Sequence, residues 1–424
     1  MRKVVLFIFH RDLRTVDHRP LQAALDAAHD ATVLPLFIFE NEQVSRRAVR
    51  SENSIACLLQ SLKELDAELP SGLAIMYGAV EKVLSALSDI VDIAAIYETA
   101  DYTPYATNRQ ARTAAACDKI GCEYTAVDDL YLFPPGSILN GSGNAYQKFT
   151  PFYDAAIKMK TPTVLGKVTG PFLSKALVSK ISQYTLDEMT DHILTAAQQK
   201  TVTGRRFLGG RQEGLQLLRR IPKEYDTIRN IAAENTSGLS VHHHYGTISI
   251  RESWWAAEKA LKKDNLKGFQ RQLIWRDFYA HLMAEWDTIY SKKYGELHEW
   301  LQERPKLTKK QQEQFTAWCE GKTGIPLIDA GMTEMNQTGF MHNRARMVVA
   351  SVLTRDWGIP WQWGAGYFAE KLCDYDYVQN TMNWLHIAEH FPFSQAPFRR
   401  HDPYTSAKRV DPDNAYINHW LKIE

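Results

Sequence analysis

The chain lacks any long hydrophobic run. No stretch of its 424 residues approaches the roughly 20 apolar positions that a membrane-spanning helix requires. The apolar start at Val4–Phe9 is too short for the core of a secretory signal and reads instead as a buried strand. We therefore expect a soluble, intracellular protein that carries neither a signal peptide nor a transmembrane segment.

Cysteine is also scarce, and no charge of one sign dominates. The five cysteines are scattered and odd in number, and no pair has metal-site spacing, so the sequence predicts no metal site and a reducing compartment. The net charge is +1 from 50 basic and 49 acidic residues. This balance neither requires nor excludes nucleic acid, because a basic patch can lie on one face of a neutral protein.

Strand and helix patterns alternate through the first part of the chain, which predicts a parallel sheet with helices on both faces. A GxGxxG dinucleotide fingerprint is missing after the first strand. We predict an α/β, Rossmann-like N-terminal domain over residues 1–130. Its expected strands are Val4–Phe9, Thr32–Phe39, Leu73–Tyr77, Ile93–Glu98 and Cys122–Val127, and its expected helices are Pro20–Ala28, Ser54–Leu69, Val80–Leu87 and Asn108–Ile120.

The remaining sequence differs in character. Residues 131–204 mix Pro, Gly, Ser and Lys with weak periodicity, which indicates an interdomain linker with some local structure. From residue 205 to residue 424 helical periodicity dominates, and we predict an all-α C-terminal domain there. All eleven tryptophans lie in that part, beyond residue 253.

Three helical segments carry residues suited to a cofactor. The run 373–387 crowds two aspartates, amides and aromatics into a few positions. The turn Thr236–Ser240 offers hydroxyls at a helix start, which suits either a plain N-cap or a phosphate cradle. Trp275 and Arg276 stand side by side, as a core pair or as a base-stacking and phosphate-binding pair.

These segments together resemble the photolyase/cryptochrome flavoprotein family over nearly the whole chain, and most closely its cyclobutane pyrimidine dimer photolyases. The similar segments are His10–Asp17, Asp101–Tyr105, Phe149–Phe152, Thr236–Ser240, Leu273–Arg276, Gly321–Pro326, Thr338–Met347 and Asp374–Trp384. His10 and His18 depart from the family signature. Each motif alone is weak, but the ordered set with matching intervals is specific.

The resemblance implies a C-terminal domain that binds FAD non-covalently and uses it as FADH⁻. In this arrangement Arg346 and Asp374 form a buried ion pair beside the ring, and Asn380 faces flavin N5. The polar run would then wrap one face of a buried flavin. The implied cofactor-binding residues are Tyr225, Thr236, Ser237, Gly238, Leu239, Ser240, Gln272, Arg276, Asn343, Arg346, Asp374, Asp376 and Asn380.

The resemblance also implies electron transfer through Trp384 and then Trp361, whose alternative role is core packing. Thr308 stands where the family usually has a third, surface tryptophan. Trp363, Trp357 or Tyr377 is a candidate substitute, unless the relay ends early.

On the substrate side, the resemblance implies light-driven repair of cyclobutane pyrimidine dimers in DNA, with the lesion flipped into a pocket. Gln272 replaces a usual glutamate and His386 a usual second tryptophan, while Asn343 and Met347 stand where (6-4) photolyases have a histidine pair. The implied substrate or DNA contacts are Gln272, Trp275, Asn343, Arg344, Met347, His386 and Arg399.

Several alternatives stay open at this level. They are a (6-4) photolyase, a cryptochrome-like blue-light photosensor, and a nucleic-acid-binding flavoprotein that has lost repair. Sensors commonly carry a C-terminal extension, and this chain ends directly after the helical region. The N-terminal domain resembles an antenna-binding domain for folate or deazaflavin, but Arg109 replaces a frequent folate-contacting glutamate, so the antenna stays unassigned. We expect a monomer whose partner is dimer-containing DNA.

Overall fold

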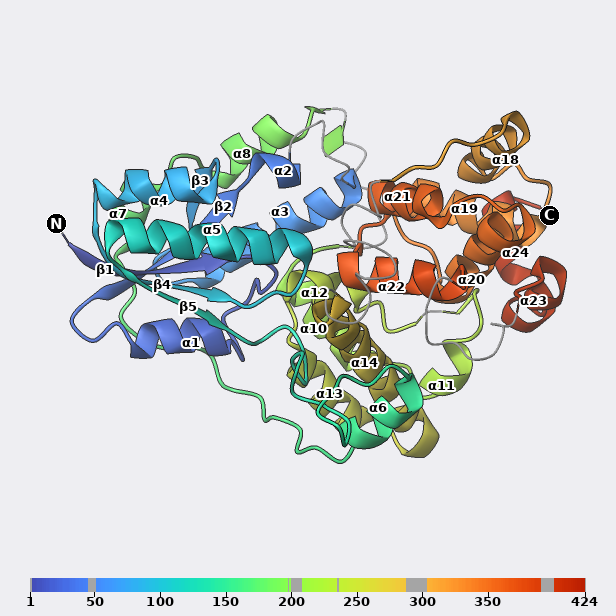
Figure 1. Ribbon diagram of the computed structural model, residues 1–424, viewed down its shortest axis with the longest axis horizontal. Coiled ribbons are helices and arrows are strands. Elements are labelled where there is room, and N and C mark those ends of the chain that lie inside the picture. Colours follow the sequence, from blue (N-terminus) through green and yellow to red (C-terminus); the bar gives the residue numbers. More distant parts are fainter. Residues whose placement is uncertain are drawn as a thin grey trace.

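A five-stranded parallel sheet forms the N-terminal part of the structure, a computed structural model that describes residues 2–44, 51–196, 198–199, 208–234, 236–286, 303–389 and 400–423. The strand order is β3-β2-β1-β4-β5, and all four strand pairs are parallel. The carboxyl ends of all strands therefore meet at one edge, which faces the helical part (Figure 1). The strands are β1 (Lys3–Phe9), β2 (Thr32–Phe39), β3 (Ala74–Tyr77), β4 (Asp92–Thr99) and β5 (Glu123–Val127).

The strands form because they can bury apolar side chains on both faces. Along β1, Val5 and Phe7 belong to one apolar cluster, while Leu6 and Ile8 belong to a second cluster on the opposite face. The helices that cover these faces are α1 (Arg19–Asp26), α2 (Asn41–Val44), α3 (Glu52–Glu68), α4 (Val80–Ser88) and α5 (Pro104–Ile120). The predicted α/β domain is confirmed, and its strand and helix bounds agree within a few residues.

Among the described residues of the segment that the sequence predicts to be a linker lie the helices α6 (Phe149–Ala156), α7 (Lys175–Ile181) and α8 (Leu186–Ile193). Helix α7 contacts β3 and α8 contacts α3, whereas α6 packs on a helix of the C-terminal part. The segment thus contributes to both parts of the molecule, and the domain boundaries at 130 and 204 stay predictions.

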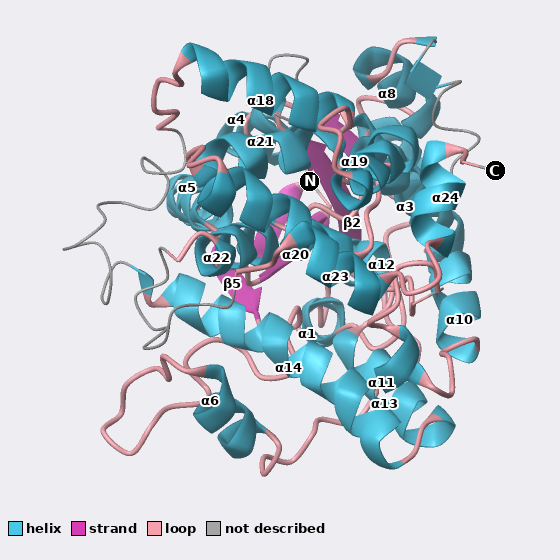
Figure 2. Ribbon diagram, turned by 90° about the vertical axis from the view of Figure 1, so that its right-hand side faces the viewer, coloured by secondary structure: helices cyan, strands magenta, loops and turns pink. Residues whose placement is uncertain are grey.

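The described residues of the C-terminal part form helices and loops and contain no strand (Figure 2). They supply most of one large apolar cluster. No helix in the described part of the chain is both long and apolar enough to cross a membrane. The helices are α10 (Arg211–Arg219), α11 (Tyr225–Ile228), α12 (Ser240–Tyr245), α13 (Ile250–Ala260), α14 (Lys263–Ala284), α18 (Lys309–Glu320), α19 (Pro326–Thr338), α20 (Asn343–Ser351), the π-helix η1 (Val352–Asp356), α21 (Trp361–Lys371), α22 (Tyr377–Ile387), α23 (Pro403–Val410) and α24 (Ala415–Leu421).

Buried charges join the two parts. The Arg251 guanidinium of α13 lies 2.8 Å from Asp17 and 2.6 Å from Asp129, and Arg14 also pairs with Asp129. The side chains of all four residues are at most 2% exposed. Removing one partner from such a network leaves a buried charge unpaired, which is strongly destabilising. The sequence signature at residues 10–17 therefore fastens the helical part to the carboxyl edge of the sheet.

Candidate functional site: a polar and aromatic cavity beside helix α22

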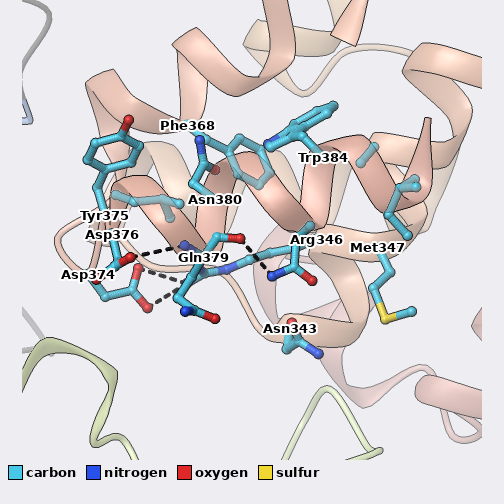
Figure 3. Close-up of a pocket in the computed structure, with 14 residues that line it drawn as sticks. Asn343, Arg346, Met347, Phe368, Asp374, Tyr375, Asp376, Gln379, Asn380 and Trp384 are labelled. Carbon is cyan, nitrogen blue, oxygen red and sulfur yellow. Dashed lines mark hydrogen bonds and ion pairs between the residues drawn. The ribbon is translucent and has the colours of Figure 1, made fainter. Parts of the chain in front are cut away.

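A cavity that opens to solvent lies between α20, α21 and α22, and its empty space, open solvent included, is about 540 Å³ (Figure 3). Carboxylates, amides and a guanidinium line it together with aromatic and aliphatic side chains. Its lining residues are Asn343, Arg346, Met347, Ala350, Phe368, Leu372, Asp374, Tyr375, Asp376, Gln379, Asn380, Asn383, Trp384 and Ile387.

The ion pair between Arg346 and Asp374 closes one side of the cavity. Arg346 Nη2 lies 3.0 Å from Asp374 Oδ1 and 2.9 Å from Oδ2, and Arg346 Nε donates to the carbonyl of Met341 at 2.8 Å. The Asp374 side chain is 4% exposed and that of Arg346 is 23% exposed. The predicted pair is therefore present, and it ties α20 to the turn that precedes α22.

Asp376 connects the cavity to the sheet. Its Oδ1 caps α22 by accepting the Gln379 N–H at 3.0 Å, and its Oδ2 accepts from Arg11 Nη1 at 2.7 Å. Arg11 also pairs with Asp101 at 2.8 Å. Burial by itself would raise the pKa of Asp376, but the Arg11 charge and the nearby imidazole of His244, 3.7 Å away, hold that pKa well below its usual range. Asp376 is thus a stable buried anion at neutral pH.

Asn380 and Trp384 lie one turn apart on α22 and face the cavity together (Figure 3). The Asn380 amide donates to the carbonyl of Ala365 at 3.3 Å. Trp384 is 2% exposed and lies against the backbone of Gly364, where an added Cβ would come within 2.2 Å of the indole. The glycine therefore permits the close contact between α21 and this indole.

Helix α14 carries three predicted residues that do not line this cavity. Trp275 stacks on Phe149 with ring centroids 3.6 Å apart and planes 4° apart, and its ring lies 6.5 Å from that of His386. Gln272 is half-buried and its amide donates weakly, at 3.5 Å, to a carbonyl of its own helix. Arg276 donates to the carbonyls of Leu130 at 2.6 Å and His243 at 3.3 Å. A hydrogen bond of 3.0 Å from the Gln379 amide to the Arg276 carbonyl links this helix to α22.

The predicted hydroxyl turn lies outside the residues that line the cavity. Leu239 is buried, Ser240 begins α12, and Gly238 has a φ of +65° that favours glycine. A side-chain hydrogen bond joins Ser237 to Tyr225, whose hydroxyl has its pKa raised to about 12 by burial. Thr236 is half-buried at the start of this turn. Tyr225 therefore lies next to the predicted turn 236–240, and both are separate from the cavity.

Among the described residues predicted to contact DNA, Arg344 carries a fixed positive charge, and it lies beside the cavity-lining Met347. Arg344 donates through Nε to Asn230 at 3.0 Å and is half-buried. Burial lowers its pKa, and the charges of Arg229 and Arg409 lower it further. Met347 lies within 3.5 Å of Arg344 Nη1 and also lines the cavity. Arg399 lies outside the described residues.

His386 is uncharged at neutral pH in this environment. Burial lowers the pKa of its imidazole to about 4, and repulsion from His401 contributes to the lowering. The position that usually holds a tryptophan in the family thus offers a neutral ring near Trp275.

The two predicted relay tryptophans line different cavities, Trp384 the one described above and Trp361 a second one. Trp361 is 1% exposed and lines a second groove with Pro305, Ile359 and Ala388. Thr308 caps α18, because its hydroxyl accepts the Gln311 N–H at 3.2 Å. The threonine at the usual third tryptophan position therefore serves the local start of a helix.

Sequence reasoning missed half of the cavity lining. Gln379, Asn383 and Ile387 follow Asp376 and Asn380 at helical spacing of three and four, so this face of α22 could have been read from the sequence. The other missed residues come from α20, α21 and the turn before α22, where no polar pattern marks them. They are Ala350, Phe368, Leu372 and Tyr375.

A parallel α/β domain joined to a helical domain that holds a polar and aromatic cavity defines a two-domain, cofactor-binding class of protein. The family model "DNA photolyase" matches residues 5–166, and the family model "FAD binding domain of DNA photolyase" matches residues 269–423. The chain belongs to the DNA photolyase family.

Relatives of known name are similar over almost the full chain. A deoxyribodipyrimidine photo-lyase of Synechococcus is 31% identical, with 99% of this chain and 88% of the relative covered. The crystal structure of an archaeal photolyase from Sulfolobus tokodaii, which holds two FAD molecules, is 31% identical with a TM-score of 0.80, covering 99% of this chain and 90% of that chain. A Synechocystis cryptochrome is 24% identical with a TM-score of 0.84, covering 100% of this chain and 89% of that chain, a likeness that shows the fold alone.

Proposed function

We propose that this protein is a light-driven deoxyribodipyrimidine photo-lyase, which splits cyclobutane pyrimidine dimers in DNA. The observation that carries the proposal is the cavity in which the Arg346–Asp374 ion pair, Asn380 and Trp384 converge. Relatives that share this chain's length and about 30% of its residues bear that enzyme name. The activity follows from the site together with these relatives, because fold alone does not define a reaction.

The lining of the cavity fits the isoalloxazine part of FAD. A flat ring with apolar faces and polar edges requires aromatic contacts and hydrogen-bonding groups in one site, and both kinds are present. Asn343, Gln379, Asn380 and Asn383 supply amides that both donate and accept. When bound in its reduced form, FADH⁻, the cofactor supplies the electron that light drives to the dimer.

Each chain residue then has a proposed task. Arg346 and Asp374 hold the polar edge of the ring, and Asn380 faces its N5 side. The hydroxyls of Thr236, Ser237 and Ser240 hold the phosphates and ribityl chain. The other proposed cofactor contacts are Tyr225, Gly238, Leu239, Gln272, Arg276, Asn343 and Asp376.

The lesion would enter beside Trp275, which stacks on Phe149 through one face and would stack on the dimer through the other. Gln272 would offer hydrogen bonds to the edge of the dimer. His386, whose ring lies 6.5 Å from that of Trp275, would add a neutral ring to the pocket. Asn343 and Met347 complete the pocket. The charges of Arg344, Arg229 and Arg409 support a role in holding DNA phosphates, which Arg399 would share.

The proposal leaves the antenna chromophore unassigned between folate and deazaflavin. Arg109 is 5% exposed, lies 3.9 Å from Glu98 and places its guanidinium 5.6 Å above the Tyr105 ring. This packing faces the interior of the domain, so it does not favour either chromophore. We further propose a monomer that acts in the DNA-containing compartment of the cell; a sedimentation measurement with and without DNA tests the first point.

Repair of a dimer-containing oligonucleotide by illuminated, reduced protein tests the proposal directly. We expect repair by the parent protein and a fall of roughly 10- to 100-fold in affinity for damaged DNA in Trp275→Ala, from the stacking energy of one base on one indole. Affinity for undamaged DNA should stay nearly constant, since phosphate contacts dominate it.

The matched control is Trp255→Ala, which removes a half-buried tryptophan from α13. It should change neither affinity. Equal losses on damaged and undamaged DNA in Trp275→Ala would show that Trp275 is a core residue. Flavin photoreduction without any dimer repair would favour the photosensor, and repair restricted to (6-4) lesions would favour that enzyme class.

A further inference from the structure

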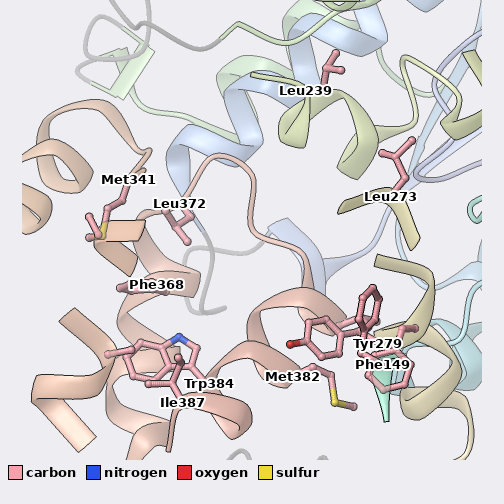
Figure 4. Close-up of a cluster of buried hydrophobic side chains, with 14 of the residues drawn as sticks. Phe149, Leu239, Leu273, Tyr279, Met341, Phe368, Leu372, Met382, Trp384 and Ile387 are labelled. Carbon is pink, nitrogen blue, oxygen red and sulfur yellow. The ribbon is translucent and has the colours of Figure 1, made fainter. Parts of the chain in front are cut away.

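Trp384 has aromatic neighbours other than Trp361, its expected partner in a linear relay. Its ring lies 5.1 Å from Phe368 and 6.4 Å from Trp318, both in edge-to-face orientation. Figure 4 shows Trp384 and Phe368 within the apolar cluster that lies behind the cavity. The indole that lines the cavity is therefore in close reach of another indole, on α18.

Trp318 is fully buried and held in one orientation. It is 0% exposed, and its indole N–H donates to the Val349 carbonyl at 3.1 Å. A carbonyl accepts a hydrogen bond but cannot take the proton, so an oxidised Trp318 would keep its proton and pass the charge on. Its ring lies 5.8 Å from that of Tyr367 on α21.

Tyr367 brings this path to the surface. The residue is half-buried, and its hydroxyl lies 2.8 Å from Oδ1 of the exposed Asn336 and 2.9 Å from the Cys319 carbonyl. A phenol that loses an electron also loses its proton, and the position at the surface gives that proton an exit to water. Lys371 Nζ lies 5.3 Å from the centre of the Tyr367 ring. Its positive charge disfavours a cationic Tyr367 radical but does not disfavour the neutral radical that remains after the proton is lost.

We propose that Trp318 and Tyr367 form a branch of the electron-transfer relay, which runs from Trp384 through Trp318 to Tyr367. This proposal rests on the proposed photolyase function, because it assumes a photoexcited oxidised flavin as the electron acceptor. It also replaces the surface terminus that the Thr308 helix cap cannot provide.

The electrons and the proton balance along this branch. One electron leaves Trp384 for the excited flavin. Trp318 then donates one electron to the oxidised Trp384, and Tyr367 donates one electron to the oxidised Trp318. Tyr367 releases its phenolic proton to water and is left as a neutral radical. A thiol in solution then gives Tyr367 one electron and one proton and is itself oxidised to a thiyl radical.

Transient absorption of purified, flavin-loaded protein tests the branch. The parent protein should show a neutral tyrosyl radical after a flash, and photoreduction of the flavin by thiol should follow. In Tyr367→Phe the tyrosyl signal should disappear, and in Trp318→Phe both that signal and the photoreduction rate should fall severalfold. Because tyrosine oxidation releases a proton, the formation of the tyrosyl radical should be slower in heavy water than in ordinary water in the parent protein. In Tyr367→Phe this kinetic phase should be absent in both solvents.

Three controls separate the branch from folding and from the proposed function. Trp254→Phe changes another buried tryptophan, on α13, and should photoreduce like the parent. Trp384→Phe should abolish both branches. Trp318→Phe, Tyr367→Phe and Trp254→Phe, after chemical reduction in the dark, should repair dimers at the parent rate if they retain flavin.

Unchanged tyrosyl signal and photoreduction in Trp318→Phe would overturn the branch. Failure of the chemically reduced parent to repair dimers would overturn the proposed function instead, while leaving the radical measurements interpretable.

Discussion

Replacing Asp374 by alanine tests the assignment of the cavity most directly. The substitution removes both oxygens that contact Arg346 Nη2 at 2.9 and 3.0 Å, while Arg346 keeps its bond to the Met341 carbonyl. Removing one partner of a buried pair typically costs 3–5 kcal/mol of unfolding free energy. Because the Arg346 side chain is 23% exposed and keeps one acceptor, we expect the lower part of that range, about 3 kcal/mol.

The assay must separate the ion pair from the cofactor, since a ligand that binds only the folded state adds its own stabilisation. We would measure the unfolding free energy of flavin-free parent and variant in urea, and then repeat both with excess FAD. The difference between the flavin-free proteins reports the ion pair, and the additional loss with FAD reports the cofactor contact. The variant should also purify with much less flavin than the parent.

Two controls define the result. Asp374→Asn keeps an oxygen acceptor and the shape of the side chain, so its unfolding free energy and flavin content should lie between those of the parent and those of Asp374→Ala. Asp187→Ala breaks an exposed pair with Lys63 on the far part of the molecule and should alter neither stability nor flavin content measurably. Full flavin occupancy in Asp374→Ala, with no loss of stability in the flavin-free protein, would refute the role given to this pair.

Three further predictions follow from the site and its surroundings. Gln272→Glu should raise the rate of dimer repair, most clearly at mildly acidic pH, because a protonated carboxyl can share a proton with the dimer and an amide cannot; an equal or lower rate in a repair assay across pH would contradict this. Burial raises the pKa of Asp277 to about 7, so folded protein holds a proton on Asp277 that unfolded protein loses near pH 4, and this group should contribute a fall in stability of roughly 4 kcal/mol from pH 4 to pH 7, measured as the difference between the parent and Asp277→Asn. Asp277→Asn should remove that slope, and an unchanged slope would place its origin elsewhere. Gly364→Ala should cost about 1–3 kcal/mol through overpacking and slow flavin photoreduction, since its Cβ would lie within 2.2 Å of the Trp384 indole; parent-like photoreduction would show that the indole position is not critical.

The fold could be predicted well where local pattern and burial agree. Thr32–Phe39 is an apolar run that becomes a central strand with those bounds, because both of its faces are covered by helices. The helices between 149 and 193 were harder to predict, since each spans only seven or eight residues. Short helices draw most of their stability from tertiary packing, and a sequence pattern does not contain that information.

The site could be predicted where residues act through a motif, and not where they act through distant packing. The pairing of Arg346 with Asp374 follows from the family resemblance and is present in the structure. The contact between Arg11 and Asp376 joins residues 365 positions apart, and only the folded chain brings them together. The neighbourhood of Trp318 and Trp384 is of the same kind, since the two indoles meet through the packing of separate helices.

The polarity of the stretch around α22 has a structural reason beyond the cofactor. Asp374 contacts α20, Asp376 contacts the end of β1 through Arg11, Gln379 contacts α14, and Asn380 contacts α21. Each polar side chain thus ties a different neighbouring segment to this one helix. A buried polar group is tolerated only when it is hydrogen-bonded, so the four contacts fix the positions of four segments around the helix at once. The cavity is therefore held in shape from the sheet as well as from the helical part, which explains why residues from the first strand signature bear on a site formed about 360 residues later.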